Sequence, residues 1–298
     1  MDGILNILKP SHATSHDIVN LIRKRFHTKK VGHTGTLDPM AVGVLPICIG
    51  KATKVSQFLL DDMKKYRCEM VLGAKTDTQD RWGKVIATYD MNVSENDIMD
   101  VFNTFRGEIN QVPPMYSALK HQGKKLYELA REGKEIHRDP RKVHIYELEI
   151  VQINGHTILF DVLCSKGTYV RTLCTDIGDM LNCGAYMSFL VRSQSGIFHL
   201  ENTVTLEELA ELPPEEIILN HLFPIDYPLS NLPKIEVKNE SMKFLLNGNT
   251  LYPHNLHNTD SLVPDTQVRL YADNDFIALG KVKLKDQHLS VDIDRVFS

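Results

Sequence analysis

The most informative part of this 298-residue chain is Lys30-Val-Gly-His-Thr-Gly-Thr-Leu-Asp38-Pro-Met-Ala-Val-Gly-Val-Leu-Pro-Ile-Cys-Ile-Gly50. Two glycines, Gly32 and Gly35, flank His33 and open backbone conformations that other residues do not reach. Asp38 precedes a proline, which favours an extended backbone over a helix. The apolar run over residues 42–49 predicts a buried strand. This part of the chain therefore predicts a carboxylate on a rigid loop at the mouth of a core strand.

The charges around this loop are unusual. Asp38 is the only acid between Ile18 and Leu60, and the same segment carries seven bases: Arg23, Lys24, Arg25, Lys29, Lys30, Lys51 and Lys54. A lone carboxylate in a basic field suits an enzyme that acts on a polyanion, because the bases hold phosphates and the acid reacts. The structural alternative is an Asx-turn, in which Asp38 bonds only to its own backbone.

The segment Gly50-Lys51-Ala52-Thr53 is similar to the end of a nucleotide-binding Walker A motif. That motif requires a glycine five positions before its Gly-Lys pair, where this chain has Leu45, and a serine or threonine directly after the lysine. The chain has Ala52 there, so the spacing excludes a nucleotide-phosphate loop.

Residues 32–46 resemble the catalytic motif of the TruB-type tRNA pseudouridine-55 synthases almost residue for residue. Further matches follow in the same order, over roughly residues 4–200: Lys65-Tyr66-Arg67, Leu72-Gly73, Thr76-Asp77-Thr78, Ser165-Lys-Gly-Thr-Tyr169-Val-Arg171 and Phe189-Leu190-Val-Arg-Ser193. One departure is His12, which stands where the family pattern Lys-Pro-x-Gly has glycine.

The resemblance assigns roles to six residues. It implies that Asp38 is catalytic, acting at the ribose as a nucleophile or as the group that stabilises charge there. Arg171 would pair with Asp38 and orient it, although an arginine in the first turn of a helix is ordinarily exposed. Tyr66 would stack on the target uracil, and this tyrosine or a water would take part in proton transfer. Three further residues are implied to contact the nucleotide: His33, Tyr169 and Leu190.

The resemblance implies an RNA-modifying isomerase that converts the uridine at position 55, in the T-loop of tRNA, to pseudouridine. The reaction breaks the N1–C1′ bond, turns the uracil over and joins C5 to C1′, so no cofactor or metal is expected. The target base must first be flipped out of its stack. The alternative, a non-catalytic RNA-binding or tRNA-chaperone protein, explains the basic segments but not the joint presence of Asp38, Tyr66 and Arg171.

The expected fold is α+β. By resemblance, residues 1–230 form a catalytic domain of the pseudouridine-synthase type, with a mixed, mainly antiparallel sheet flanked by helices. Residues 111–142 resemble an inserted thumb that closes over the tRNA as a mobile basic lid. Short strand-like runs between turns over residues 231–298 predict a small β-rich barrel, similar to the PUA-type RNA-binding domain.

Local patterns make several further predictions. They indicate a helix capped by Thr14 or Ser15, another over residues 51–60, and a loop over residues 73–83. Asn154-Gly155 predicts a hairpin turn, and Thr168 is the expected N-cap of the helix that contains Arg171.

The net charge of −4 does not exclude a nucleic-acid partner, because the charge is segregated. Residues 201–226 contain seven acids and no lysine or arginine, whereas the bases gather in residues 20–54 and 120–142. The local field decides where a polyanion binds. The expected contacts to the RNA backbone are Lys9, Lys51, Lys54, Lys120, Lys124 and Lys125.

Cysteine and histidine spacing favours no metal site. The five cysteines form no Cys-x-x-Cys pair, which predicts buried thiols. His254 and His257 stand three apart without other ligand types nearby, which predicts an exposed loop. No run is long enough to span a bilayer and no signal peptide is evident. We therefore expect a cytoplasmic protein that binds the T-stem-loop of tRNA as a monomer, with no obligatory protein partner.

Overall fold

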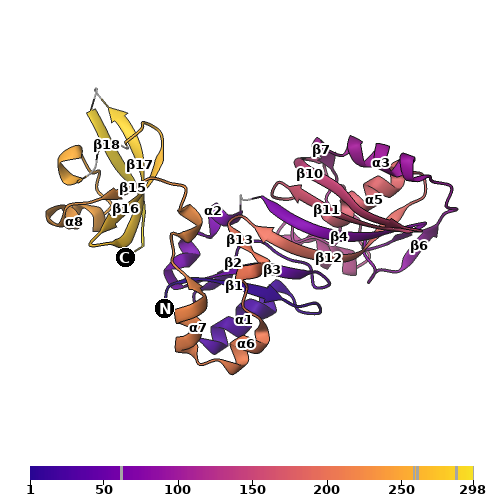
Figure 1. The fold of residues 1–298 in the computed structure, drawn as a ribbon, viewed down its shortest axis with the longest axis horizontal. Helices are drawn as coiled ribbons and strands as arrows, with labels where there is room; N and C mark the ends of the chain where they lie inside the picture. Colours follow the sequence, from indigo (N-terminus) through magenta and orange to yellow (C-terminus); the bar gives the residue numbers. More distant parts are fainter. Residues whose placement is uncertain (61–62, 258, 260–261, 286–287, 298) are drawn as a thin grey trace.

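The computed structural model describes residues 1–298 except 61–62, 258, 260–261, 286–287 and 298. Its centre is a mixed sheet (Figure 1). The strands of this sheet are β1 (Gly3–Lys9), β2 (Val31–His33), β3 (Val42–Ile49), β4 (Lys64–Leu72), β7 (Gly107–Gln111), β10 (Arg141–Asn154), β11 (Thr157–Cys164), β12 (Ala185–Ser195), β13 (Phe198–His199) and β14 (Leu222–Phe223).

The strand order is β14-β1-β3-β12-β4-β11-β10-β7, with β2 paired to β3 and β13 to β12. Among the described residues, β3 and β12 form the parallel pair of this sheet and the other pairs are antiparallel. The predicted mixed, mainly antiparallel sheet is confirmed. The Asn154-Gly155 turn joins β10 to β11 as predicted, with a positive φ of 57° at Gly155.

Helices flank the sheet at both ends (Figure 1). Helices α1 (Ser15–Arg25), α6 (Leu206–Glu211) and α7 (Pro214–His221) pack against β1 and β3, while α3 (Glu95–Thr104) and α5 (Val170–Met180) pack against β4 and β11. Thr14 caps α1 through a capping box with Asp17, as the sequence predicts. In the described part of the chain, no helix is long and apolar enough to cross a membrane.

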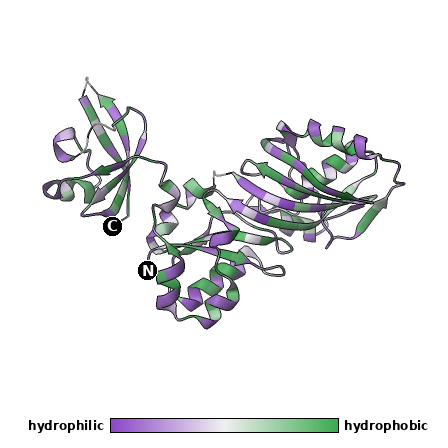
Figure 2. Cartoon of the chain, viewed as in Figure 1, coloured by the Kyte–Doolittle hydropathy of each residue, from purple (hydrophilic) through white to green (hydrophobic). Residues whose placement is uncertain are grey.

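Strand β4 shows how the sequence positions the site. Its buried side chains alternate along the strand, with Tyr66, Cys68 and Met70 on one face and the polar positions between them on the other. Figure 2 shows hydrophilic and hydrophobic residues interspersed along the strands of this sheet. The buried face packs against α5, through Cys174 and neighbouring apolar residues. Because Tyr66 belongs to the buried series, its ring points toward the helix that carries Arg171.

Three local predictions are wrong. Residues 51–60 do not form one helix but a 3-10 turn (Gly50–Lys54) followed by α2 (Ser56–Leu60). The predicted loop over residues 73–83 contains β5 (Ala74–Thr76), which pairs with β6 (Val85–Thr88). The β-branched residues Thr76 and Val85 lie opposite each other in this pair, and such residues favour strands. Thr168 is not the N-cap of α5: Tyr169 is, and the Thr168 hydroxyl donates to the Ser165 carbonyl instead.

The basic insertion over residues 111–142 contains two short strands and a helix: β8 (Lys120–His121), β9 (Lys124–Lys125) and α4 (Leu126–Arg131). Leu126 and Leu129 of α4 are buried, so the insertion has a small apolar anchor of its own. Its lysines remain on the outer side of that anchor. The structure thus provides a compact basic element beside the large mixed sheet.

The C-terminal residues form a second, four-stranded sheet with its own apolar core. It consists of β15 (Lys234–Glu236), β16 (Gln267–Ala272), β17 (Asp275–Lys285) and β18 (His288–Val296), beside the short helix α8 (Met242–Leu246). The described strands follow the order β15-β16-β17-β18, so the predicted β-rich C-terminal domain is confirmed, and its closure into a barrel stays a prediction. The sequence predicts separate short strands over residues 276–279 and 281–284, and in the structure these are one strand, β17. The domain boundary after residue 230 stays a prediction, because Leu279 and Phe297 share a packing cluster with Ile4.

All five cysteines are free and buried, as predicted. Burial raises the pKa of the Cys48 and Cys164 thiols from 9.0 to about 12. Above the ordinary thiol pKa the unfolded chain therefore binds fewer protons than the folded chain, and the free energy of unfolding falls as the pH rises, by about 1.4 kcal/mol per thiol and pH unit.

We expect urea unfolding, followed by circular dichroism, to give lower stability at about pH 10 than at about pH 8. The Cys48→Ala/Cys164→Ala double variant should lose less stability over the same pH interval. The cavities that the two substitutions leave lower its stability at both pH values and so do not affect this difference. Equal losses in the two proteins would contradict the buried-thiol explanation.

Candidate active site

A cavity of about 830 Å³ opens between the loop after β2, the ends of β4 and β12, the basic insertion and the start of α5. The six site residues predicted from the resemblance all line it: His33, Asp38, Tyr66, Tyr169, Arg171 and Leu190. Residues far apart in the sequence are thus brought to one place. The volume lies in the upper part of the range for small-molecule pockets, which leaves room for a nucleotide and part of its surroundings.

The loop that carries Asp38 is fastened at several points. The Ser15 hydroxyl donates to the Leu37 carbonyl at 3.0 Å and accepts the Leu37 N–H at 2.8 Å. On the other side, Nη2 of Arg192 donates to the Gly35 carbonyl at 3.3 Å, and Gly35 has a φ of 134° that side chains rarely adopt. The Asp38 side chain itself stays one-third exposed, facing the cavity.

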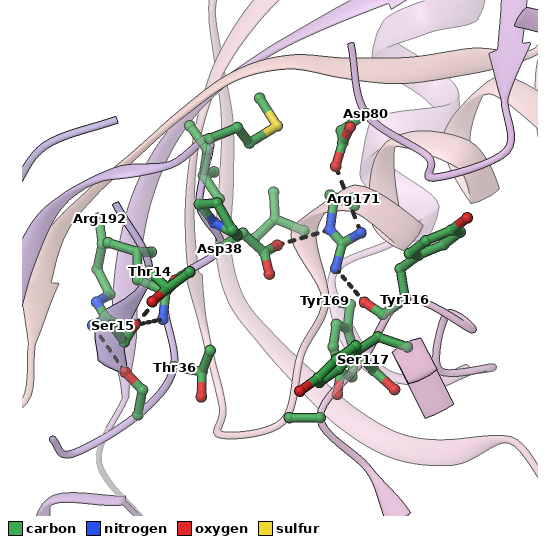
Figure 3. Close-up of a pocket in the computed structure, with 18 of the residues that line it drawn as sticks. Thr14, Ser15, Thr36, Asp38, Asp80, Tyr116, Ser117, Tyr169, Arg171 and Arg192 are labelled. Atoms are coloured by element: carbon green, nitrogen blue, oxygen red, sulfur yellow. Dashed lines mark hydrogen bonds and ion pairs between the residues drawn. The ribbon is translucent and has the colours of Figure 1, made fainter. Parts of the chain in front are cut away.

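Arg171 approaches Asp38 from the start of α5 (Figure 3). Its Nε lies 2.8 Å from Oδ2 of Asp38, as an ion pair without the alignment of a linear hydrogen bond. Nη1 and Nη2 donate to the carbonyls of Thr78 and Tyr116, at 3.0 and 2.9 Å. The guanidinium is therefore not bidentate on the carboxylate but spreads over three loops. Its side chain is only 4% exposed, so these partners fix its position.

Asp80 is a second carboxylate at this guanidinium that the sequence did not single out. Its Oδ2 lies 3.6 Å from Nη1 of Arg171, whereas Asp38 faces Nε of the same guanidinium (Figure 3). Its Oδ1 accepts from the Thr78 hydroxyl and from the Trp82 N–H, at 2.7 and 3.0 Å. Burial raises the pKa of the Asp80 carboxyl. The sequence signal that could have pointed to Asp80 is its position at the end of the polar run Thr-Asp-Thr-Gln-Asp80, in a segment predicted to be a loop.

Tyr66 and Tyr169 contribute two rings to the cavity. Burial raises the pKa of Tyr66 to about 12, so the phenol is neutral at physiological pH and its hydroxyl retains its proton. Burial also raises the pKa of Tyr169. The backbone of Tyr169 is held by Gln111, whose side-chain amide donates to its carbonyl at 3.1 Å and accepts its N–H at 2.8 Å. Gln111 thereby ties the start of the basic insertion to the start of α5.

Arg192 is a further site residue that sequence reasoning missed. It pairs with Tyr66 across β12 and β4, is 1% exposed, and donates through Nε to the Val44 carbonyl at 2.7 Å. Gly43 makes this possible, since a Cβ there would lie 2.3 Å from the Arg192 carbonyl oxygen. A buried arginine among strand carbonyls holds β3, β12 and the Asp38 loop in register.

Comparisons with known proteins identify the family of this chain. Residues 23–170 match the model described as TruB family pseudouridylate synthase (N terminal domain), and residues 171–230 match the tRNA pseudouridylate synthase B C-terminal domain. The tRNA pseudouridine synthase B of Alkaliphilus oremlandii (strain OhILAs) is 51% identical, over 97% of this chain and 95% of its own. That of Clostridioides difficile (strain 630) is 45% identical over 100% of both chains.

The chain belongs to the TruB family. Solved structures agree with this assignment. A chain of the Cbf5-Nop10-Gar1 complex aligns with a TM-score of 0.74 and 31% identity, over 99% of this chain and 85% of that one. A chain of an H/ACA RNP bound to a substrate RNA containing 2′-deoxyuridine aligns with a TM-score of 0.73 and 28% identity, at the same coverage of both chains.

For this TruB-family chain, the structure revises one expected RNA contact. Lys9 is fully buried, and its Nζ donates to the carbonyls of Pro10 and Ala13, both at 2.7 Å. Burial lowers the pKa of this ammonium group from 10.5 to about 8. An ammonium enclosed by backbone carbonyls does not face a phosphate, so the prediction for Lys9 is wrong and its role is to fix the N-terminal loop.

The other lysines that are expected to contact the RNA backbone lie on the surface or at the cavity. Lys54 donates to the Val296 carbonyl at 2.7 Å, which directs it toward the C-terminal sheet rather than the cavity. Lys51, Lys120 and Lys124 are exposed, and Lys125 lines the cavity. Contact of these lysines with RNA stays a prediction.

His33 lies at the end of β2, a strand that the sequence did not predict. The ring is half-buried and its Nδ1 accepts the Gly35 N–H at 3.3 Å. Burial lowers the pKa of His33 below its ordinary value of 6.5, which keeps the ring neutral at physiological pH. A neutral ring at the cavity wall loses less solvation when it contacts a base.

Proposed function

We propose that this chain converts uridine 55 in the T-loop of tRNA to pseudouridine, with Asp38 as the catalytic carboxylate. The observation that carries the proposal is the Asp38–Arg171 ion pair of 2.8 Å at the wall of a cavity that also contains Tyr66. These three residues come from separate sequence motifs. A turn residue without chemistry would not require a buried arginine brought from another element.

The proposed reaction uses each group in a defined way. The N1–C1′ bond breaks while the Asp38 carboxylate attacks C1′ or stabilises the charge that develops there. The uracil turns over against the ring of Tyr66 and C5 bonds to C1′; where Asp38 has attacked C1′, the bond between its oxygen and C1′ breaks in this step and the carboxylate is restored. The hydrogen on C5 is lost and N1 gains one, so the product is an isomer of the substrate. With its raised pKa, Tyr66 retains its own proton and serves as a stacking surface and hydroxyl donor.

The target base has to leave its stack before Asp38 can reach the sugar. Flipping a base costs a few kcal/mol, which contacts in the pocket offset. The apolar wall for the flipped base is provided by Tyr66, Tyr169 and Leu190. His33 also lines the cavity and would occupy the space that the base leaves in the RNA. We propose the basic insertion as the lid over this complex.

We also propose that the chain acts as a monomer without an obligatory protein partner. In support, the ion pair, both tyrosines and the basic insertion around the cavity all come from one chain. Light scattering of the protein, alone and with tRNA, tests this: a one-to-one complex is expected, and a stable dimer would contradict it.

Tritium release from a tRNA transcript labelled at C5 of uridine tests the activity directly, since the C5 hydrogen is lost only if C5 forms the new bond. Chemical mapping of pseudouridine in the product then gives the position. Release equal to one tritium per tRNA, with the product at position 55, is expected. Tight tRNA binding without release would favour the non-catalytic alternative.

The basic insertion makes a separate prediction about salt. We expect the Lys120→Ala/Lys124→Ala/Lys125→Ala variant to bind tRNA more weakly and to reduce the slope of log affinity against log salt by about 2–3, because each lost phosphate contact removes about 0.7–0.9. The matched control is Lys142→Ala, whose Nζ is already paired with Glu108 at 2.8 Å. An unchanged slope in the triple variant would remove these lysines from the RNA interface.

A further inference from the structure

Two aromatic rings form a stack at the edge of the cavity. The rings of His12 and Trp82 lie 4.8 Å apart between centroids, with an angle of 26° between their planes. Trp82 lines the cavity, although 47% of it is exposed to solvent. His12 occupies the position where the TruB pattern has glycine, and it adopts the left-handed backbone with a φ of 66°. The chain thus tolerates an unfavourable backbone for a residue that packs on this tryptophan.

The stack is anchored on both sides to the reacting groups. The His12 N–H donates to the carbonyl of Pro39, the residue directly after Asp38, at 2.8 Å. The backbone N–H of Trp82 donates to Oδ1 of Asp80, whose other oxygen lies 3.6 Å from Arg171. The backbones of both residues are therefore fixed relative to the ion pair, and the two rings pack on each other between them. They join the loop that carries the carboxylate to the loop that holds the guanidinium.

A purely structural role leaves the exposure of Trp82 unexplained. Large aromatic side chains that only hold loops together are ordinarily buried, since burial is the source of their stabilising effect. Here one ring partner supports the indole while nearly half of the residue remains open, next to a cavity expected to bind RNA. Single-stranded bases stack on such platforms irrespective of their identity, because every base has an aromatic face.

We propose that His12 and Trp82 form a stacking platform for an RNA base adjacent to the target nucleotide. The proposal rests on the proposed function, since it requires a flipped nucleotide at Asp38. The target base itself belongs at Tyr66, which is 9% exposed and lies deeper in the cavity. The platform at the edge receives the neighbouring base that flipping leaves without its stacking partner.

The chain offers a direct probe, because Trp82 is its only tryptophan. The Asp38→Asn protein, which is expected to bind without turnover, is titrated with a T-arm stem-loop RNA while tryptophan emission is recorded. We expect the emission to be quenched on binding and acrylamide quenching of the remaining emission to fall at least twofold. Binding is measured independently by the anisotropy of a fluorescein on the RNA. Saturated RNA binding with unchanged emission and unchanged acrylamide quenching overturns the proposal.

Kinetics separate stacking from loop support. We expect Trp82→Ala to raise the KM for tRNA about tenfold, which corresponds to ~1.4 kcal/mol, with kcat changed less than KM. Trp82→Phe should restore most of the KM, because a phenyl ring still stacks. A structural role alone would instead lower kcat and the melting temperature. An unchanged KM in Trp82→Ala, or no recovery in Trp82→Phe, counts against the platform.

The matched control is Tyr146→Ala. Tyr146 is 48% exposed and also packs against a histidine, His144, at 4.5 Å, but neither residue is among the described residues that line the cavity. We expect its KM to equal that of the parent chain. If tritium is released normally while Trp82 fails both tests, only the platform is refuted. If the parent chain releases no tritium, the proposed function fails as well.

Discussion

The Asp38→Asn variant is expected to bind tRNA as the parent chain does and to lose turnover by a factor of at least ~10⁴, or ~5 kcal/mol of activation free energy. An amide has the shape of the carboxylate but neither its charge nor its nucleophilicity, so both proposed roles at C1′ are lost. The fold should survive, because the side chain is one-third exposed and the turn is closed by the Asp38 carbonyl, which accepts the Ala41 N–H at 3.1 Å. Single-turnover tritium release and a thermal melt measure the two expectations.

Asp80→Asn is the control that separates direct chemistry from electrostatics. It removes the same charge from the same guanidinium, but Asp80 is 11% exposed and faces Nη1 of Arg171, whereas Asp38 faces Nε (Figure 3). Loss of the Asp80 charge should slow the reaction by about 10–100-fold, because Arg171 would be held less firmly in its position beside Asp38. If the two variants lose equal activity, Asp38 acts only through Arg171. Residual activity above about 1% in Asp38→Asn would remove it from the chemistry altogether.

Much of this site could be predicted because its residues lie in short motifs with a restricted backbone. Asp38 is held between glycines and a proline, and Arg171 follows a Ser-Lys-Gly-Thr turn. The alternation in β4 likewise predicts a buried face that includes Tyr66. In each case local sequence restricts the position of one side chain. The family resemblance then indicates that the three side chains meet.

What could not be predicted depends on contacts between distant segments. The Arg171–Thr78 hydrogen bond joins residues 93 positions apart, and the role of Asp80 follows from it. Arg192 and Lys9 are charged residues of types that are ordinarily exposed. They are buried here because strand and loop carbonyls accept their N–H groups, and these partners exist only once the sheet has formed. The parallel pairing of β3 with β12 is invisible to local patterns for the same reason.

The uneven distribution of charge fits a complex in which RNA binds on the cavity side of the molecule, away from the acidic helices α6 and α7. The acidic segment over residues 201–226 supplies α6 and α7, which pack on the α1 side of the sheet, whereas the cavity and the basic insertion lie beside α5. Asp226 pairs with Arg269 of β16 at 2.7 Å, which links the segment that follows α7 to the C-terminal sheet. We expect this local charge distribution to direct a polyanion to the cavity side of the molecule, despite a net charge of −4.

Arg171→Lys is the second substitution with a large expected effect, although it keeps the charge. The guanidinium reaches Asp38, the Thr78 carbonyl and the Tyr116 carbonyl at once, and an ammonium at the end of a flexible stem does not reproduce that fork. At least one buried carbonyl would lose its partner, and Asp38 would lose its orientation. We expect kcat to fall by about 10²–10³ and the free energy of unfolding by about 1–3 kcal/mol.

The same exchange at Arg67 is the matched control for this expectation. Arg67 is the neighbour of Tyr66 on β4 and makes a true bidentate pair with Asp161, through Nε at 2.8 Å and Nη2 at 2.7 Å, but its side chain is 52% exposed. Because solvent screens such a pair, Arg67→Lys should leave kcat within about twofold and barely change stability. Near-normal turnover in Arg171→Lys would mean that charge alone suffices at this position, and that the spread of the guanidinium over three loops does not position Asp38 for the reaction.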